Sequence, residues 1–215
     1  MKKELLCRVA VVIGSVALAA SMSACALTED RVPIDNVPPE ARPPVAGAAA
    51  VTLEIKGIDE RQQYRDRIGT KKNGYGMEMA RITATNDVVE VVRLGVEQGL
   101  MAEGFGIGPG NLTVNIELQN FYNNYRVGLV SADAVGEVAF ALKVRNASGT
   151  LLYNQLYSVA NVYDGVFWMG GANAKASLEK ATALVVRQVL DDTALQAALL
   201  ATVAKPTPGN RRPGS

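Results

Sequence analysis

The chain has 215 residues, enough for one ordinary domain with appendages and too few for two full-sized domains with tails. Apolar residues make up 48% of it, which supplies a hydrophobic core and excludes a wholly disordered chain. A formal charge of +1 argues against a general nucleic-acid binder, and the absence of histidine excludes the Ser-His-Asp and Cys-His nucleophile systems and the usual zinc-ligand sets.

The first 24 residues have the pattern of a bacterial signal peptide. Basic residues precede an apolar run at 9–20, and this run is shorter than the roughly 20 residues that a membrane-spanning helix needs. Ser23 and Ala24 stand directly before Cys25, with Met22 at a position more often held by leucine. The segment resembles the lipobox of bacterial lipoproteins.

This resemblance implies a processing route and a location. Residues 1–24 are removed, the Cys25 thiol receives diacylglycerol, and the new amine is acylated, so that the protein would label with palmitate. Ala26 rather than aspartate follows the cysteine, which implies the outer membrane, with the protein on its periplasmic face. The alternative is a secreted protein with a free cysteine. Because Cys7 leaves with the signal peptide, no disulfide can form within the folded region.

The distribution of proline divides the rest of the chain. Residues 25–48 are proline-rich and poor in large apolar residues, which favours a tether between the lipidated cysteine and the domain. The alternative is an ordered arm lying on the domain. A single domain is expected at 49–202, followed by a disordered tail at 203–215.

Within the domain, alternating apolar residues predict strands and apolar residues one turn apart predict helices. The expected fold is α+β, with two layers: an antiparallel-rich sheet of four to five strands and two main helices packed on one face. Asn86 or Asp87 is expected to cap the first helix, and Asp192 a short continuation of the second. In chain order, the predicted elements are a strand at 51–56, a possible strand at 77–85, a helix at 87–103, strands at 112–118, 138–145 and 151–162, and a helix at 172–190.

Several of these segments also resemble a known family. The sequence 57–61 directly after the first strand, the valine-rich helix ending at Gly104, and the strand 112–118 running into Phe121 and Tyr122 resemble the YajG-type outer-membrane lipoproteins. With the lipobox and the long C-terminal helix, the resemblance covers most of residues 20–200. It implies a periplasm-facing lipoprotein without known enzymatic activity, with a weak hint of cell-wall processes, and it supplies no catalytic residues.

Two short segments are candidate contacts for a partner. Asp59 and Arg61 lie two apart at the end of a strand, so their side chains point the same way and can pair. The pair is either a structural ion pair or a polar contact to a partner. Phe167 and Trp168 lie in a glycine-flanked segment before the last helix, where they either pack beneath that helix or anchor a partner protein or the lipid interface.

Tyrosines and asparagines on neighbouring strands form a third candidate, with Tyr122 and Tyr125 at its centre. Aromatic faces beside amide groups could hold a glycan such as peptidoglycan, although strand tyrosines are commonly half-buried sheet residues. The carboxylates are scattered, so no catalytic residue, cofactor or metal is expected. The sequence therefore favours a non-enzymatic binding or scaffolding lipoprotein with a membrane anchor and an envelope protein or peptidoglycan partner; the alternative is a glycan- or lipid-binding module.

Overall fold

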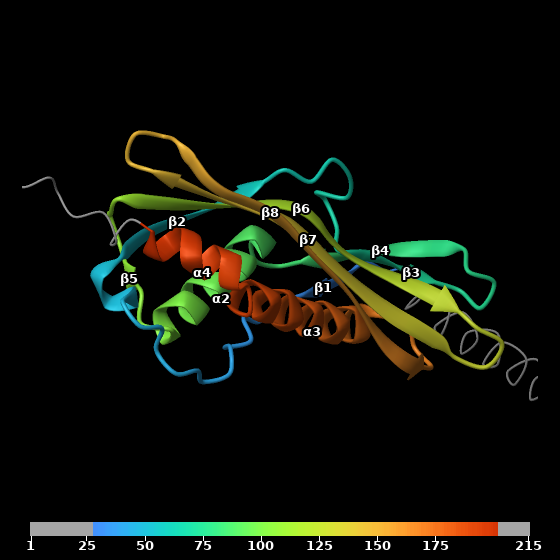
Figure 1. Cartoon of the computed structure of the whole chain (residues 1–215). Helices are drawn as coiled ribbons and strands as arrows, with labels where there is room; N and C mark the ends of the chain where they lie inside the picture. The colour runs from blue at the N-terminus through green and yellow to red at the C-terminus, as the bar shows by residue number, and fades with distance from the viewer. Residues whose placement is uncertain (1–27, 202–215) are drawn as a thin grey trace, which may run out of the picture.

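The computed structural model describes residues 28–201 (Figure 1). The predicted signal peptide, Cys25 and the tail at 203–215 lie outside the described residues. Eight strands form one mixed sheet, and α2, α3 and α4 accompany it. The strands are β1 (Asp30–Val32), β2 (Thr52–Asp59), β3 (Gly69–Lys72), β4 (Glu78–Ala84), β5 (Gly106–Ile107), β6 (Leu112–Val127), β7 (Ala132–Asn146) and β8 (Leu151–Val166).

The prediction of an antiparallel-rich sheet of four to five strands with two main helices is therefore wrong. β2 runs parallel to β6 over seven residue pairs, and β1 runs parallel to β4. Parallel pairing is possible here because a long connection containing α2 (Val88–Ala102) separates β2 from β6, whereas a tight turn permits only antiparallel neighbours. The three strands absent from the prediction, β1, β3 and β5, have two to four residues each, too few for an alternating pattern to show.

β6 is the central strand of the sheet. β7 pairs antiparallel with one of its edges over nearly its full length, and β8 pairs with β7 beyond. The other edge of β6 is shared, because β2 pairs with its first half up to Leu118, and β3 pairs with it at Asn123. The chain from 60 to 68 crosses between β2 and β3 beside the part of β6 that neither strand occupies.

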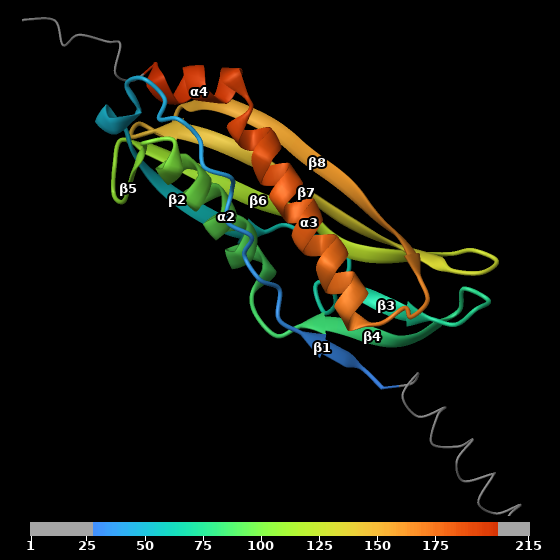
Figure 2. The same cartoon turned by 90° about the horizontal axis from the view of Figure 1, so that it is seen from below.

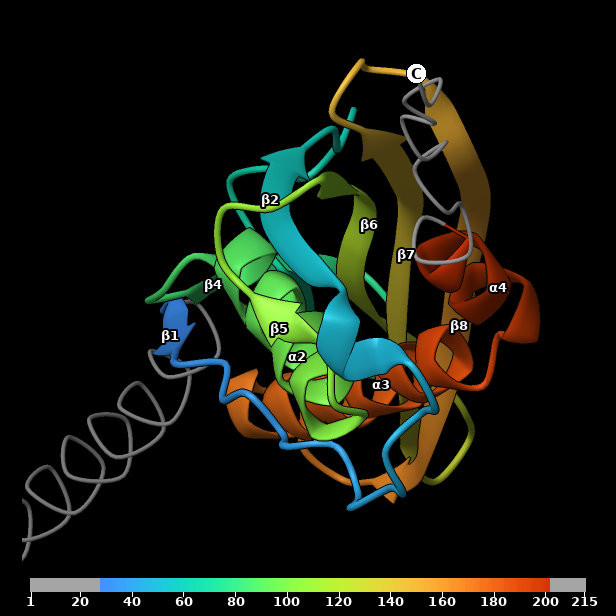
Figure 3. The same ribbon diagram turned by 60° about the vertical axis from the view of Figure 1, so that its left-hand side comes forward.

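The helices α2 and α3 (Gly171–Leu190) lie on one face of the sheet, and α4 (Thr193–Leu200) lies beside β8 (Figures 2 and 3). Asp87 caps α2 by accepting a hydrogen bond from the backbone of Val89, as predicted for this position. Asp192 caps α4 in the same way, through the backbone N–H groups of Ala194 and Leu195. Both caps were predicted and are confirmed.

The hydrophobic core lies between this sheet face and the helices. The alternating stripe of β6 is fully buried, as the sequence predicts. It meets apolar stripes from the neighbouring strands and from both long helices. Buried residues of the core include Leu112, Val114, Ile116, Leu118, Val138, Phe140, Val92, Val96, Leu178, Ala181 and Val185.

Residues 30–48, expected as part of a tether, lie along the domain. Ile34 is buried, and its backbone N–H and C=O both hydrogen-bond the side chain of Asn86 at 2.9 Å. Arg42 pairs with Asp191 at 2.6 Å. The side chain of Asp30 accepts a hydrogen bond from the backbone of Gly171, which fixes the start of β1 beside the start of α3. The described chain thus joins the fold from Asp30 onward.

Candidate functional site: a tyrosine and arginine loop and an apolar end

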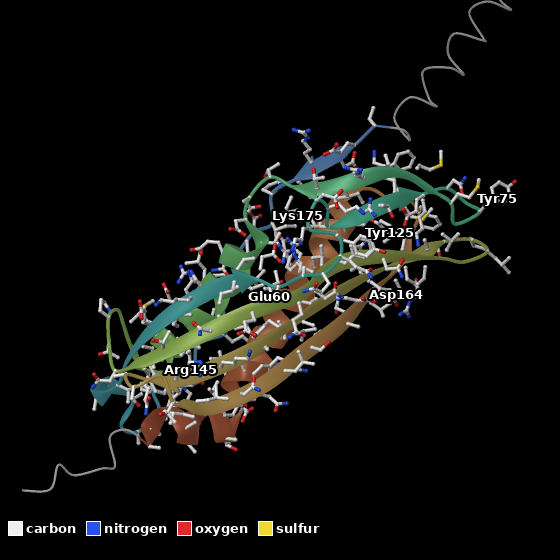
Figure 4. The ribbon with its side chains drawn as sticks, turned by 90° about the horizontal axis from the view of Figure 1, so that it is seen from above. Glu60, Tyr75, Tyr125, Arg145, Asp164 and Lys175 are labelled. Atoms are coloured by element: carbon white, nitrogen blue, oxygen red, sulfur yellow. The ribbon has the colours of Figure 1, made fainter. Side chains whose placement is uncertain are left out.

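The loop 60–68 occupies the gap between β2 and β3. Its ends are held to β6, since the backbone of Glu60 donates to Leu118 and the backbone of Asn123 donates to Ile68. A bulge in the pairing of β6 with β7, between Leu118 and Asn120, lies beside this loop. An irregular segment therefore lies within an otherwise continuous sheet, in the middle of the molecule where Figure 4 labels Glu60.

Asp59 and Arg61 form the expected ion pair at the start of this loop. The Arg61 Nε and one terminal nitrogen donate to the two carboxylate oxygens of Asp59, both at 2.9 Å. Arg61 is only 6% exposed. Hydrogen bonding from Arg61 lowers the pKa of Asp59, against the opposing effect of burial. A bidentate pair of this kind is geometrically specific, and it fixes the backbone from which the next side chains project.

Tyr64 and Arg67 are functional candidates that the sequence alone did not single out. Tyr64 has a φ of 56°, a left-handed conformation that costs a non-glycine residue energy. Its ring stacks on the ring of Tyr122 with centroids 4.3 Å apart, and the Arg67 guanidinium lies 4.9 Å from the Tyr64 ring centroid. The Arg67 Nε is buried without a hydrogen-bond partner in residues 28–201. The left-handed backbone of Tyr64 and the unpaired donor of Arg67 make this loop a candidate site.

Two pockets flank this loop. The first, of about 210 Å³, is lined by Arg61, Arg65 and Arg67 together with the chain before α2, including Asp87. Arg65 reaches back to the backbone carbonyls of Arg61 and Asp59, at 2.6 and 2.8 Å. The second pocket, of about 370 Å³, lies on the side of Tyr122. It is lined by Gln62, Gln63, Tyr64, Gln119, Asn120, Tyr122 and Glu137.

The tyrosines expected to share one sheet face are divided between several environments. Tyr125 is buried, and its hydroxyl donates to the carbonyl of Gly170 at 2.6 Å. Tyr153 and Tyr157 point toward α4, and their hydroxyls donate to the Asp192 carboxylate at 2.5 and 2.8 Å. Burial raises the pKa of Tyr153 to about 12. Of the two tyrosines singled out from the sequence, only Tyr122 lies at a pocket, and Tyr125 holds α3 in place.

Phe167 and Trp168 are exposed, at 82% and 60%. They do not pack beneath α3, and the Asn173 side chain fixes the loop by donating to the Trp168 carbonyl at 2.7 Å. Two other connections at the same end of the molecule also present large apolar side chains (Figure 2). We call this surface the apolar end; its residues are Tyr75, Met77, Leu129, Val130, Phe167 and Trp168.

Neither a metal site nor a membrane span is apparent in the part of the chain that the structure describes. Within residues 28–201, histidine, cysteine and acidic side chains nowhere gather in threes as metal ligands would. None of the helices in the same range combines the length and the apolar character needed to cross a bilayer. The polar groups that line the two loop pockets include arginines, amides, phenols and the carboxylates of Asp66, Asp87 and Glu137.

Comparison with solved structures identifies the fold. Protein XCC0632 from Xanthomonas campestris, of the DUF330 family, superposes with a TM-score of 0.53 at 13% identity, over 76% of this chain and 92% of that one. A candidate lipoprotein from Caulobacter crescentus gives 0.41 at 14% identity, over 66% and 92%. A minor lipoprotein from Acinetobacter baumannii gives 0.37 at 8% identity, over 65% and 91%. The first of these shows a shared fold.

No curated protein sequence matches the chain significantly. The model of the family Lipoprotein_16, described as uncharacterized lipoprotein, matches residues 39–200. This range includes β2 to α4, the loop 60–68 and all three connections of the apolar end. The match agrees with the YajG-type resemblance that the sequence shows. The chain therefore belongs to this family of uncharacterised lipoproteins.

Proposed function

We propose that the protein is a periplasm-facing lipoprotein of the outer membrane, anchored through acyl chains on Cys25, which binds an envelope partner and catalyses no reaction. Membership of a lipoprotein family supports attachment to an envelope membrane by lipid. The observation that carries the binding role is the convergence of Arg61, Arg65 and Arg67 on one pocket beside a strained loop.

The three arginines of this pocket favour an anionic partner, because the two carboxylates of the pocket have other contacts: Asp66 pairs with Arg81, and Asp87 caps α2. The charge of Arg61 is already matched by Asp59, whereas Arg65 hydrogen-bonds backbone carbonyls and Arg67 lies over Tyr64. A guanidinium group offers five donors in a planar fork that fits a carboxylate. An acidic side chain of an envelope protein would give Arg65 and Arg67 a charged acceptor. It would also supply the buried Arg67 Nε with a hydrogen bond.

The same groups argue for binding rather than catalysis. An arginine does not lose its proton in the physiological range, so it cannot relay protons as a general acid or base. The Asp59 carboxylate is hydrogen-bonded to Arg61, which holds it ionised. Burial raises the pKa of Tyr122, which keeps that phenol neutral. Near neutral pH, Asp59 therefore stays ionised and Tyr122 stays neutral.

A glycan is the second candidate ligand, and the pocket beside Tyr122 favours it. Amide side chains supply both donors and acceptors, as sugar hydroxyls require, and tyrosine rings offer apolar faces. Four amide residues, Gln62, Gln63, Gln119 and Asn120, line this pocket. Peptidoglycan would bring sugar rings and carboxylates together, and could therefore engage both pockets at once.

A site-specific crosslinking experiment tests the proposed function. A photoreactive amino acid replaces the exposed residue Gln63 in the full-length protein in cells. The expected result is a defined adduct that is lost in the Arg65→Gln, Arg67→Gln double variant. The Arg145→Gln variant is the matched control, since Arg145 lies at the opposite end from Tyr75 (Figure 4), and it should retain the adduct. An adduct that persists in the double variant would remove the arginine pocket as the partner site.

Two further measurements separate the remaining alternatives. Retention of the native protein on purified sacculi, and its loss in a Gln63→Ala, Asn120→Ala variant of the pocket beside Tyr122, would select the glycan. The proposed anchor is tested with Cys25→Ala, which should lose palmitate labelling and sedimentation with outer membranes. If that variant still labels and sediments in the same way, the proposed anchor is wrong.

A further inference from the structure

The apolar end is formed by three separate connections that meet at one end of the elongated molecule (Figures 1 and 2). The β3–β4 turn carries Tyr75 and Met77, and the β6–β7 turn carries Leu129 and Val130. The β8–α3 connection carries Phe167 and Trp168. Their exposed fractions are all at least 58%. Large side chains at turn centres are unusual, since turns favour glycine, proline, asparagine, aspartate and serine, so their clustering calls for an occupant.

Backbone and side-chain hydrogen bonds fix the conformation of two of the three connections. In the β6–β7 turn, the backbone of Gly128 donates to the carbonyl of Ser131 at 2.9 Å, which projects the two residues between them outward. In the β3–β4 turn, the Asn73 side chain accepts hydrogen bonds from the backbones of Tyr75 and Met77, both at 3.0 Å. The apolar groups are therefore preorganised for contact, which lowers the entropic cost of binding.

The start of the described chain lies at this same end (Figure 2). The side chain of Asp30 accepts a hydrogen bond at 2.7 Å from the backbone of Gly171, the first residue of α3 and three residues after Trp168. Four residues lie between Cys25 and Asp30, and the five residue-to-residue steps that join them span at most about 18 Å. An acylated Cys25 would therefore bring the bilayer surface within reach of Phe167 and Trp168.

We propose that the apolar end docks on the lipid surface, with its six side chains inserted among the headgroups and upper acyl chains. This inference rests on the proposed lipid anchor at Cys25, which supplies the high local concentration of membrane. Aromatic residues with a polar edge, such as Trp168 and Tyr75, are suited to the membrane interface. Docking would fix the orientation of the domain, whereas the anchor alone leaves it free to rotate.

The charges near the apolar end favour apolar insertion over attraction to anionic lipid. Arg126 and Lys72 lie on the strands leading to the tips, but Glu78 and Asp164 lie there as well. A basic cluster is what adsorption driven by anionic lipid requires. The proposal therefore predicts docking on neutral bilayers as well as on anionic ones, with little sensitivity to salt.

The single tryptophan of the chain allows a direct test, because Trp168 is the only source of indole fluorescence. The full-length lipoprotein is reconstituted into phosphatidylcholine vesicles with brominated acyl chains. The expected result is a blue-shifted emission that the bromines quench and aqueous acrylamide does not. Emission quenched by acrylamide and unaffected by the bromines would overturn the proposal. Protection from both quenchers would also overturn it, since protein would then cover the tryptophan.

Serine substitutions test whether quenching by brominated lipid depends on the apolar end. Replacing Leu129 and Val130 with serine, in a chain that keeps Trp168, should at least halve the quenching by brominated lipid. The matched control replaces Leu151 and Leu152 with serine, because these exposed leucines lie at the far end of β8, and it should leave the quenching unchanged. Equal effects of the two pairs would contradict a docking surface at the apolar end.

Failure of docking and failure of the anchor give different results. A native protein that floats with vesicles and labels with palmitate, but shows no lipid quenching, retains the anchor and refutes docking. A native protein that neither labels nor floats refutes the anchor at Cys25. In that case, lipid quenching measured at high vesicle concentration still decides whether the apolar end binds lipid by itself.

Discussion

Gly136 in β7 lies where α3 comes closest to the sheet, so replacing it with alanine tests how tightly the two layers are fixed. A Cβ atom there would be 2.4 Å from the Ser177 carbonyl oxygen and 2.8 Å from the backbone nitrogen of Leu178. Ordinary contact distances are about 3.5–4.0 Å. The helix or the strand must therefore shift by about 1 Å, which is large in a close-packed core.

The helix has little freedom to shift at this point. The Ser177 hydroxyl donates to the buried side chain of Asn123 at 2.7 Å, and Leu178 is fully buried. Overpacking costs about 1–3 kcal/mol, and replacing glycine with alanine recovers about 0.4–1 kcal/mol by restricting the unfolded chain. The Gly136→Ala variant should thus be destabilised by about 1–2 kcal/mol, which lowers Tm by roughly 2–8 °C for a domain of this size.

Thermal melting by circular dichroism, with urea midpoints as a second measure, provides the assay. Gly74→Ala is the matched control, because a Cβ atom there meets no other atom within 4 Å. It should leave Tm unchanged or raise it slightly. If the two variants melt together, the close approach of α3 to β7 is not a constraint, and the reasoning is refuted.

Three further predictions concern the ionisable groups. Tyr157→Phe removes a hydroxyl that is hydrogen-bonded to Tyr153 and Asp192, and it should lower the free energy of unfolding in urea by about 1 kcal/mol. Asp192→Ala also removes the cap of α4 and should lower that free energy further. Equal destabilisation by the two variants would contradict a stabilising role of the cap. The pKa of Tyr153 is raised from 10.0 to about 12 in the folded protein. The stability that this group contributes is therefore fully present below pH 10 and is lost as the pH rises through about 12. Urea unfolding midpoints measured across that pH range test this expectation. The lowered pKa of Asp59 has the opposite sign: stability present above its ordinary pKa of 3.8 is lost at lower pH, and Asp59→Asn should flatten this acid dependence in thermal melts.

The long, regular elements of the fold could be predicted from the sequence. The alternation in Leu112–Leu118 and the helical spacing from Val88 to Leu100 are strong periodic signals, and each lies in the predicted kind of element. Sheet size and strand direction could not be predicted, because β3 and β5 are defined by their partners and not by a pattern of their own. Gly69 pairs with Ile82 of β4 on one side and, on the other, with Asn123 of β6, which lies 54 residues later in the chain.

The candidate sites also differ in how far the sequence predicts them. The pairing of Asp59 with Arg61 was predicted from strand spacing, but Arg61 lies beyond the end of β2, and the Asp59 carboxylate also accepts a hydrogen bond from the Arg61 backbone. The stacking of Tyr64 on Tyr122 depends on the left-handed backbone at Tyr64, a conformation that no sequence pattern specifies. The apolar end likewise depends on three connections that are distant in sequence. Large apolar residues in the short turn between β6 and β7 are a sequence feature that indicates an exposed apolar surface there.

Membrane docking also constrains how two copies could associate. Within residues 28–201, β7 is the strand that pairs with β8, and β8 has 16 residues of which Asp164 alone is charged. An unprotected edge of that length invites another strand. Antiparallel pairing of two β8 strands would direct the two apolar ends in opposite directions along the shared strand axis, so only one of them could reach a given leaflet. If the apolar end docks on lipid, two copies anchored in the same leaflet therefore cannot pair through antiparallel β8 strands.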